Sequence, residues 1–177
     1  METTKNKLSE IEIDFFEELS KYLETPLYFF GSIQRNDYFP GSSDIDVDIF
    51  TDNENSTIAK MQHFLHVEHK AFKKFIWRLN DNNKLVHGYK IMYKNKEHNF
   101  SAEFSIYNKK NKEEILKEHK RKINIPFYIS WVLILLKILY YNLHIINGGY
   151  YRYLKKKALS VGLGLPDDDF VVIDAKK

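Results

Sequence analysis

The sequence has 177 residues, of which 44% are hydrophobic and 15% are aromatic. A chain of this length can bury one core large enough to offset its conformational entropy, so we expect one compact unit rather than a disordered or fibrous protein. No cysteine is present, which excludes disulfides, thiolate metal ligands and a cysteine nucleophile.

The formal net charge is only +3, but the charges are unevenly distributed. Residues 1–69 carry five basic and fourteen acidic side chains, whereas residues 70–122 carry fifteen basic and six acidic ones. This asymmetry fits an anionic ligand that bridges the two regions, and it also fits ordinary solvated surface charge.

Neither a secretion signal nor a membrane span is expected. The first residues lead into an acidic amphipathic stretch without the apolar core of a signal peptide, so we expect a cytoplasmic protein. Residues 126–146 are long enough to cross a bilayer, but Lys137 at their centre makes insertion costly. We interpret this segment as a buried helix of a soluble core, with no membrane partner.

The first elements lead to a strand with a charged face. Ser9 and Glu12 form a capping box for a helix that ends before Pro26, and a short apolar strand over 27–30 follows. Residues 44–50 then alternate strictly, with apolar residues on one face and three aspartates on the other. These aspartates are Asp44, Asp46 and Asp48.

The rest of the chain supplies further strands and helices. We expect a helix over 57–69 and strands over 74–79, 85–93 and 98–107. A charged surface helix over 109–122, the apolar helix from Pro126 and a basic helix over 150–159 come next, and the tail from Gly162 is expected to be a loop with an edge strand or arm. This order predicts an α+β fold with a mixed or antiparallel sheet.

Three carboxylates on one strand face repel one another unless a cation neutralises them. Magnesium is the natural candidate, because it prefers oxygen ligands and is commonly held by one or two carboxylates together with substrate phosphates. Upstream, Gly31 and Ser32 directly follow a strand, where backbone amides and a hydroxyl can cradle a phosphate, and Arg35 can add a cation.

The Gly31-Ser32 turn, a variable loop and then Asp44-Ile45-Asp46 on the next strand resemble the signature of the DNA polymerase beta-like nucleotidyltransferase superfamily. Arg35 also matches minimal members, whereas Asn36 stands where glycine is usual. The resemblance implies a mixed sheet with helices on one face. It also implies that Gly31 and Ser32 bind the nucleotide phosphates, and that Asp44 and Asp46 hold Mg²⁺, or Mn²⁺ in its place.

The family fold also needs a third carboxylate on a later strand. Glu103 is the only acid in the strand over 98–107 and lies on its polar face, so it is our candidate for a base or metal ligand. An exposed strand glutamate without a catalytic role is the alternative. Asp48 lies farther along its strand, and we interpret it as a charge at the rim or a supporting group.

A second, looser resemblance concerns residues 131–153, which look like the helices of noncanonical poly(A) polymerases and oligoadenylate synthetases. It implies that Lys137 reaches the triphosphate and that Tyr153 stacks on the base, although Arg152 stands where serine would be. A core lysine that extends its amine to a polar edge is the alternative for Lys137.

We therefore expect a magnesium-dependent enzyme that transfers a nucleoside monophosphate from a nucleoside triphosphate to a hydroxyl, with residues 1–122 as the catalytic core. Residues 123–177 would form carboxy-terminal helices and a tail packed on that core. The acceptor is open between an RNA 3′ end, a protein hydroxyl and a small molecule. The short chain leaves little room for a separate acceptor-binding domain, so the acceptor would be small, would dock on the basic segments, or would bind with help from a second subunit, in a homodimer or with another partner. The alternative is a catalytically silent module that binds nucleotide, RNA or a protein.

Overall fold

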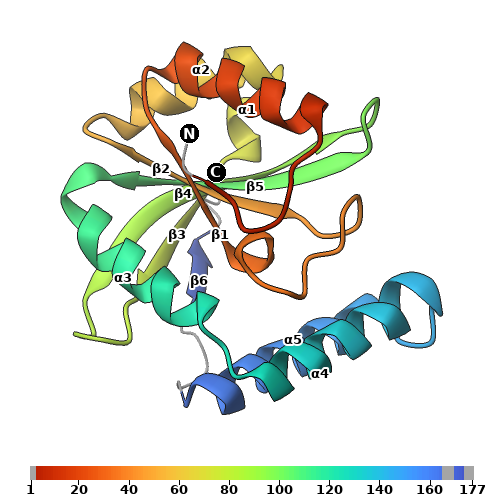
Figure 1. Cartoon of the computed structure of the whole chain (residues 1–177). Coiled ribbons are helices and arrows are strands. Elements are labelled where there is room, and N and C mark those ends of the chain that lie inside the picture. Colours follow the sequence, from red (N-terminus) through yellow and green to blue (C-terminus); the bar gives the residue numbers. More distant parts are fainter. Residues whose placement is uncertain (1–2, 165–169, 174–177) are drawn as a thin grey trace.

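The computed structural model describes residues 3–164 and 170–173. A six-stranded sheet runs through the molecule in the order β1-β2-β5-β4-β3-β6 (Figure 1). Strands β2 and β5 pair in parallel, and the other four neighbouring pairs are antiparallel. The fold is therefore α+β with a mixed sheet, as predicted. The strands are β1 (Leu27–Phe30), β2 (Ile45–Thr51), β3 (Lys73–Arg78), β4 (Leu85–Asn95), β5 (Phe100–Asn108) and β6 (Phe170–Ile173).

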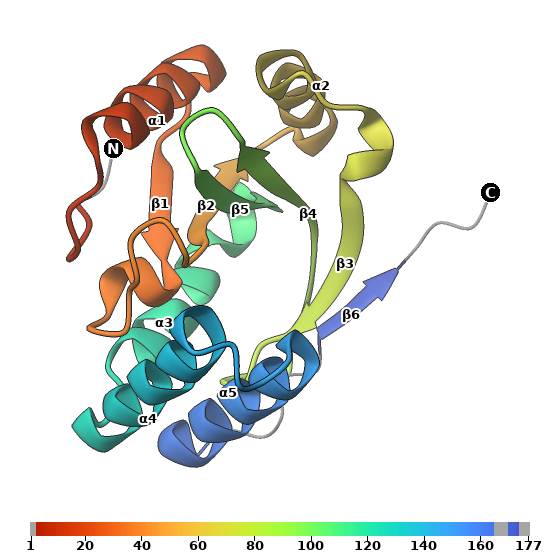
Figure 2. The same ribbon diagram turned by 90° about the vertical axis from the view of Figure 1, so that its right-hand side faces the viewer.

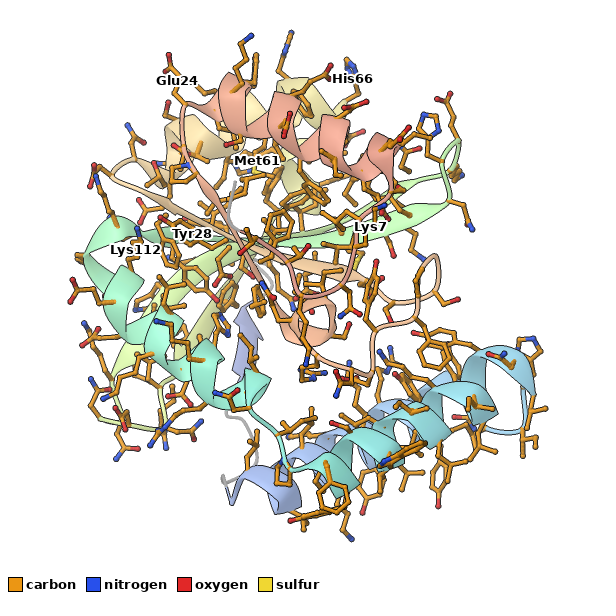
Figure 3. The ribbon with its side chains drawn as sticks, in the orientation of Figure 1. Lys7, Glu24, Tyr28, Met61, His66 and Lys112 are labelled. Atoms are coloured by element: carbon orange, nitrogen blue, oxygen red, sulfur yellow. The ribbon has the colours of Figure 1, made fainter. Side chains whose placement is uncertain are left out.

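Two helices cover one face of this sheet, α1 (Glu10–Leu23) and α2 (Glu54–Leu65) (Figure 1). The predicted capping box of Ser9 and Glu12 is present at the start of α1. The helices bury the apolar face of β2, and Met61 of α2 points into the layer between helices and sheet (Figure 3). Alternation along β2 therefore directs its even-numbered residues to the opposite face.

Helix α3 (Lys112–Ile123) lies on that opposite face, where the sequence had not placed a helix. It buries Ile115 in a second core with aromatic residues of the sheet. At its start, Lys112 donates a hydrogen bond to the Tyr28 hydroxyl (Figure 3). The segment is highly charged, as expected, yet Glu118 and His119 are also buried.

The helix expected over 57–69 has different ends. Asn53 caps α2 by accepting a hydrogen bond from the Ser56 amide, so the helix begins earlier than predicted. It ends at Leu65, because His66 adopts a left-handed conformation with φ 53°. The predicted boundaries were therefore wrong by a turn at each end.

The apolar segment after Pro126 is also not one continuous α-helix. Helix α4 (Phe127–Lys137) continues into a π-helical turn (Ile138–Asn142), and Asn147 then caps α5 (Gly148–Leu163). Helices α4 and α5 lie side by side at the end of the molecule away from α1 and α2 (Figure 2). The expected edge strand in the tail is β6, which pairs with β3, whereas residues 165–169 lie outside the described residues.

The expectation of a buried core helix is correct for only one side of α4. Ile129, Leu133 and Leu136 are buried, but Phe127 and Trp131 are largely exposed. No single helix in the described ranges is long and apolar enough to span a membrane. The segments Lys109–Ile123 and Phe127–Asn142 meet that criterion only together, and they are bent by 82° relative to each other.

Candidate active site

The polar face of β2 and β5 brings the predicted carboxylates together. In the parallel pairing of these strands, Asp46 is in register with Glu103, so both side chains lie on the same face. Asp44, just before β2, accepts a hydrogen bond from the Ser101 hydroxyl of β5. The three predicted acids thus line one cavity.

The carboxyl of Asp46 lies in an unfavourable place for a negative charge. Burial raises its pKa to about 7, and the charges of Glu103 and Asp44 add to the effect, while Lys155 and Arg35 oppose it. A raised pKa of this kind is typical of functional sites, although structural networks also produce it. Near neutral pH, Asp46 therefore binds a proton or requires a cation nearby.

The predicted Gly31-Ser32 turn lies directly against this carboxyl. Gly31 directly follows β1 in a left-handed conformation with φ +69°, and a Cβ placed on it would lie 1.8 Å from Asp46 Oδ2. Ser32 is buried in the 3₁₀ turn that begins at Gly31. Only glycine lets the backbone approach Asp46 so closely.

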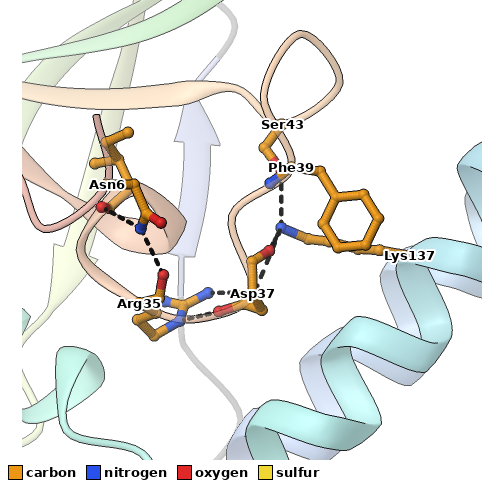
Figure 4. A network of polar contacts seen from close by, with 7 residues as sticks. Asn6, Arg35, Asp37, Phe39, Ser43 and Lys137 are labelled. Atoms are coloured by element: carbon orange, nitrogen blue, oxygen red, sulfur yellow. Dashed lines mark hydrogen bonds and ion pairs between the residues drawn. The ribbon is translucent and has the colours of Figure 1, made fainter. Parts of the chain in front are cut away.

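Arg35 and Lys137 meet at Asp37 in the loop between β1 and β2 (Figure 4). Arg35 donates two hydrogen bonds to the Asp37 carboxylate, of 2.7 and 3.1 Å. Lys137 donates to the Asp37 carbonyl and, at 2.8 Å, to the Ser43 hydroxyl. Burial disfavours ionisation of Asp37, but Arg35 and then Lys137 outweigh it and lower the pKa of Asp37.

Lys137 therefore has structural contacts in this state, since it is only 2% exposed and attaches α4 to the β1–β2 loop. Burial lowers its pKa to about 8, although Asp37 opposes the shift. Both roles that the sequence left open for Lys137, the core lysine and the triphosphate ligand, stay predictions. Lys137 also lines the cavity of the three acids.

We expect Lys137→Met to destabilise the protein by about 3 kcal/mol. Removal of this lysine leaves the buried Asp37 carboxylate with one positive charge fewer beside it. Urea denaturation at pH 7 measures the change. Lys117→Met is the matched control, since Lys117 is 69% exposed in its ion pair with Asp81 and such pairs contribute about 0–1 kcal/mol. Equal losses in the two variants would contradict a structural role for Lys137.

Two cavities, of about 840 and 380 Å³, adjoin the acid pair of Asp46 and Glu103. The smaller one has an aromatic wall that includes Trp77 and His119. Several cations border both cavities. The residues that line both are Ser32, Asp46, Lys90, Glu103, Arg152 and Lys155.

Sequence reasoning missed Lys90 altogether. Its amine lies 3.0 Å from Glu103 Oε1 and donates a hydrogen bond to it. Lys90 belongs to β4, which pairs with β5, and alternation along β4 would have placed it on the acid face had that pairing been known. Arg152 and Lys155 were noted only as part of a basic helix.

The structure does not bring Tyr153 to the acids. Its side chain is 58% exposed, and it is not among the described residues that line the two cavities. Asp48, expected either at the rim or as a supporting group, does not lie at the rim. It is fully buried beneath α3, where its Oδ2 lies 2.8 Å from His119 Nε2, and the His119 ring stacks on Phe30.

This combination of turn and acids lies within the match to a known protein family. Residues 12–125 match the family described as "Nucleotidyltransferase domain". The chain belongs to this nucleotidyltransferase family. No curated protein and no solved structure gave a significant match.

The nucleotidyltransferase match extends from α1 to just beyond α3 and includes the Gly31 turn and all three acids. Membership supports nucleotidyl transfer in general and implies a nucleoside triphosphate as substrate. Domains of this family usually use divalent metals. In the part of the chain that the structure describes, no group of three or more acidic or histidine side chains is close enough to hold a metal ion by itself.

Proposed function

We propose that the protein is a magnesium-dependent nucleotidyltransferase that transfers a nucleoside monophosphate from a nucleoside triphosphate to a hydroxyl acceptor and releases pyrophosphate. The observation that carries this proposal is the register of Asp46 with Glu103 beside the Gly31 turn. The family supports the reaction class, and this arrangement would supply the acids for the chemistry.

The residues present fit a divalent cation. The raised pKa of Asp46 reflects burial and two neighbouring carboxylates, and a bound cation would relieve both costs. Asp44, Asp46 and Glu103 would hold Mg²⁺ or Mn²⁺, with substrate phosphates completing the ligands. The bound metal would polarise the α-phosphate and neutralise the leaving pyrophosphate.

The side chains of this chain would carry out the other tasks. Ser32 and the Gly31 backbone would hold phosphate oxygens, and Arg152 and Lys155 would add positive charge. Glu103 would accept the proton of the acceptor hydroxyl. The hydroxyl oxygen would then bond to the α-phosphorus, while the bond from the α-phosphorus to the oxygen that bridges it to the β-phosphate breaks. Lys90, which donates a hydrogen bond of 3.0 Å to Glu103 Oε1, would orient the carboxylate for that step.

The direct test is incubation with each of four α-labelled nucleoside triphosphates, Mg²⁺ or Mn²⁺, and total RNA, lysate protein or small hydroxyl compounds. We expect label in one acceptor class and a loss of about 100-fold or more in Glu103→Gln, because a general base contributes about 10²–10⁴-fold. Glu97→Gln is the control, since Glu97 is exposed in the turn between β4 and β5.

The competing function is a silent nucleotide-binding module, favoured by the engagement of Glu103 with Lys90. Isothermal titration of each triphosphate with and without magnesium distinguishes the two functions. Binding without transfer to any acceptor would favour the silent module, and full activity in Glu103→Gln would reject our assignment of the base.

A further inference from the structure

One side of α4 exposes an apolar stripe. Phe127, Trp131 and Leu135 follow one another at intervals of four residues and are 77%, 68% and 56% exposed. Tyr128 and Val132, beside them on the same side, are 53% and 41% exposed. Residues four apart are neighbours on a helix surface, so these five side chains form one continuous patch, which we call the α4 face.

The α4 face lies toward the upper end of the apolar patch sizes found on monomers, where patches are often functional. With roughly 150–250 Å² for each large aromatic side chain, the exposed fractions of Phe127, Tyr128 and Trp131 amount to about 400 Å², and Val132 and Leu135 enlarge the patch further. The largest apolar patch of a typical monomer measures about 300–600 Å², and larger ones usually mark interaction sites. A standard protein interface covers about 800 Å² on each partner, so the α4 face alone supplies most of one.

The chemistry of the α4 face favours a partner of the same kind. Helix α4 contains no acidic residue, and its one basic residue, Lys137, is buried on the other side. A nucleic acid or a charged protein would therefore meet no complementary charge on this face. A second copy would meet an apolar surface equal to its own without like-charge repulsion.

The stripe is also symmetric along the helix, because Phe127 and Leu135 lie equally far from Trp131. Two antiparallel copies of α4 can pair around Trp131 through a twofold axis, with Phe127 of each copy opposite Leu135 of the other. We propose that the protein forms a homodimer through the α4 face, in which the two α4–α5 hairpins pack as a four-helix arrangement.

The dimer would support the cavities that adjoin the acid pair. The same hairpin contributes Lys137, Arg152 and Lys155 to the cavity walls. Pairing of two hairpins would hold these cations in place from the outer side of α4. The inference concerns assembly and does not depend on the proposed reaction.

Light scattering coupled to gel filtration of the full chain, at ~100 µM, tests this, since interfaces of this size dissociate at micromolar concentrations or below. We expect the mass of two chains for the wild type and the mass of one chain for Trp131→Glu. Ile11→Glu is the control, because Ile11 is an exposed apolar residue of α1, 46% exposed, and should leave the double mass unchanged. Circular dichroism checks that each variant is folded.

Thiol crosslinking gives a second measurement that does not depend on a charge substitution. The chain has no cysteine, so Trp131→Cys or Ile11→Cys introduces a unique thiol. A short bis-maleimide should link two Trp131→Cys chains and leave Ile11→Cys chains single. A wild-type monomer at this concentration, a Trp131→Glu variant of double mass, or a monomer that binds phosphatidylcholine vesicles through the α4 face would each overturn the homodimer.

Discussion

Asp46→Asn should abolish nucleotidyl transfer and stabilise the metal-free protein at the same time. The amide retains the shape of the side chain but is a poor cation ligand, and the loss of several kcal/mol of charge stabilisation corresponds to about a thousand-fold or more in rate. Transfer of labelled nucleotide measures the rate. Asp52→Asn is the control, because Asp52 is 82% exposed beyond the end of β2.

The stability effect has a defined pH dependence. Burial raises the pKa of Asp46 from 3.8 to about 7, so the folded state binds this proton more tightly than the unfolded state. The contribution of Asp46 to stability is complete below about pH 4 and is lost as the pH rises to about 7. Above that range, folding must bury the ionised carboxylate, and the asparagine variant avoids this cost.

In EDTA, the free energy of unfolding of Asp46→Asn should therefore exceed that of the wild type by a few kcal/mol at pH 8. The difference should shrink as the pH is lowered to about 4. Urea denaturation across this range measures it. A difference that is independent of pH would show that Asp46 titrates normally in the fold.

Gly31→Ala should have the second large effect. A Cβ at this position would overlap the Asp46 carboxylate, 1.8 Å from Oδ2, so the acid must move. A displacement of about 1 Å at a reacting centre costs about 100-fold in rate. The left-handed backbone at Gly31 adds a loss of stability of about 1–2 kcal/mol for any residue with a side chain.

Gly164→Ala separates these two causes. Gly164 is also left-handed, with φ +60°, but a Cβ there meets no described atom within 4 Å. We expect this variant to lose similar stability and to retain transfer activity, as measured by urea denaturation and label transfer. Equal activity losses in the two variants would show that backbone strain, and not the Asp46 contact, explains the effect of Gly31→Ala.

Local patterns predicted the parts of the site that depend on one strand at a time. Strict alternation over 44–50 correctly placed Ile45 in the core, with Asp46 on the opposite face. The same alternation placed Glu103 on the polar side of its strand, and the pairing of β2 with β5 puts it beside Asp46. The catalytic role of Glu103 stays a prediction.

Features that depend on packing between distant segments were not accessible from these patterns. Asp48 is buried because α3 covers its face of the sheet and brings His119 against it. Lys137 is buried because the loop at Asp37 folds over it. Tyr153 was expected at the nucleotide, but Arg152 and Lys155 line the cavities in its place. Successive residues of a helix point about 100° apart, so the side of α5 that carries Arg152 and Lys155 leaves Tyr153 exposed.

The parallel pairing of β2 with β5 also determines when the site forms during folding. Ser101 and Asp44, which hydrogen-bond across it, are 57 residues apart in sequence, and α2, β3 and β4 lie between them. Contacts of such long range form slowly, because the loop must close before they contribute. A chain still emerging from the ribosome would thus carry the Gly31 turn and both aspartates, but it would gain a complete acid cluster only after β5 has been synthesised.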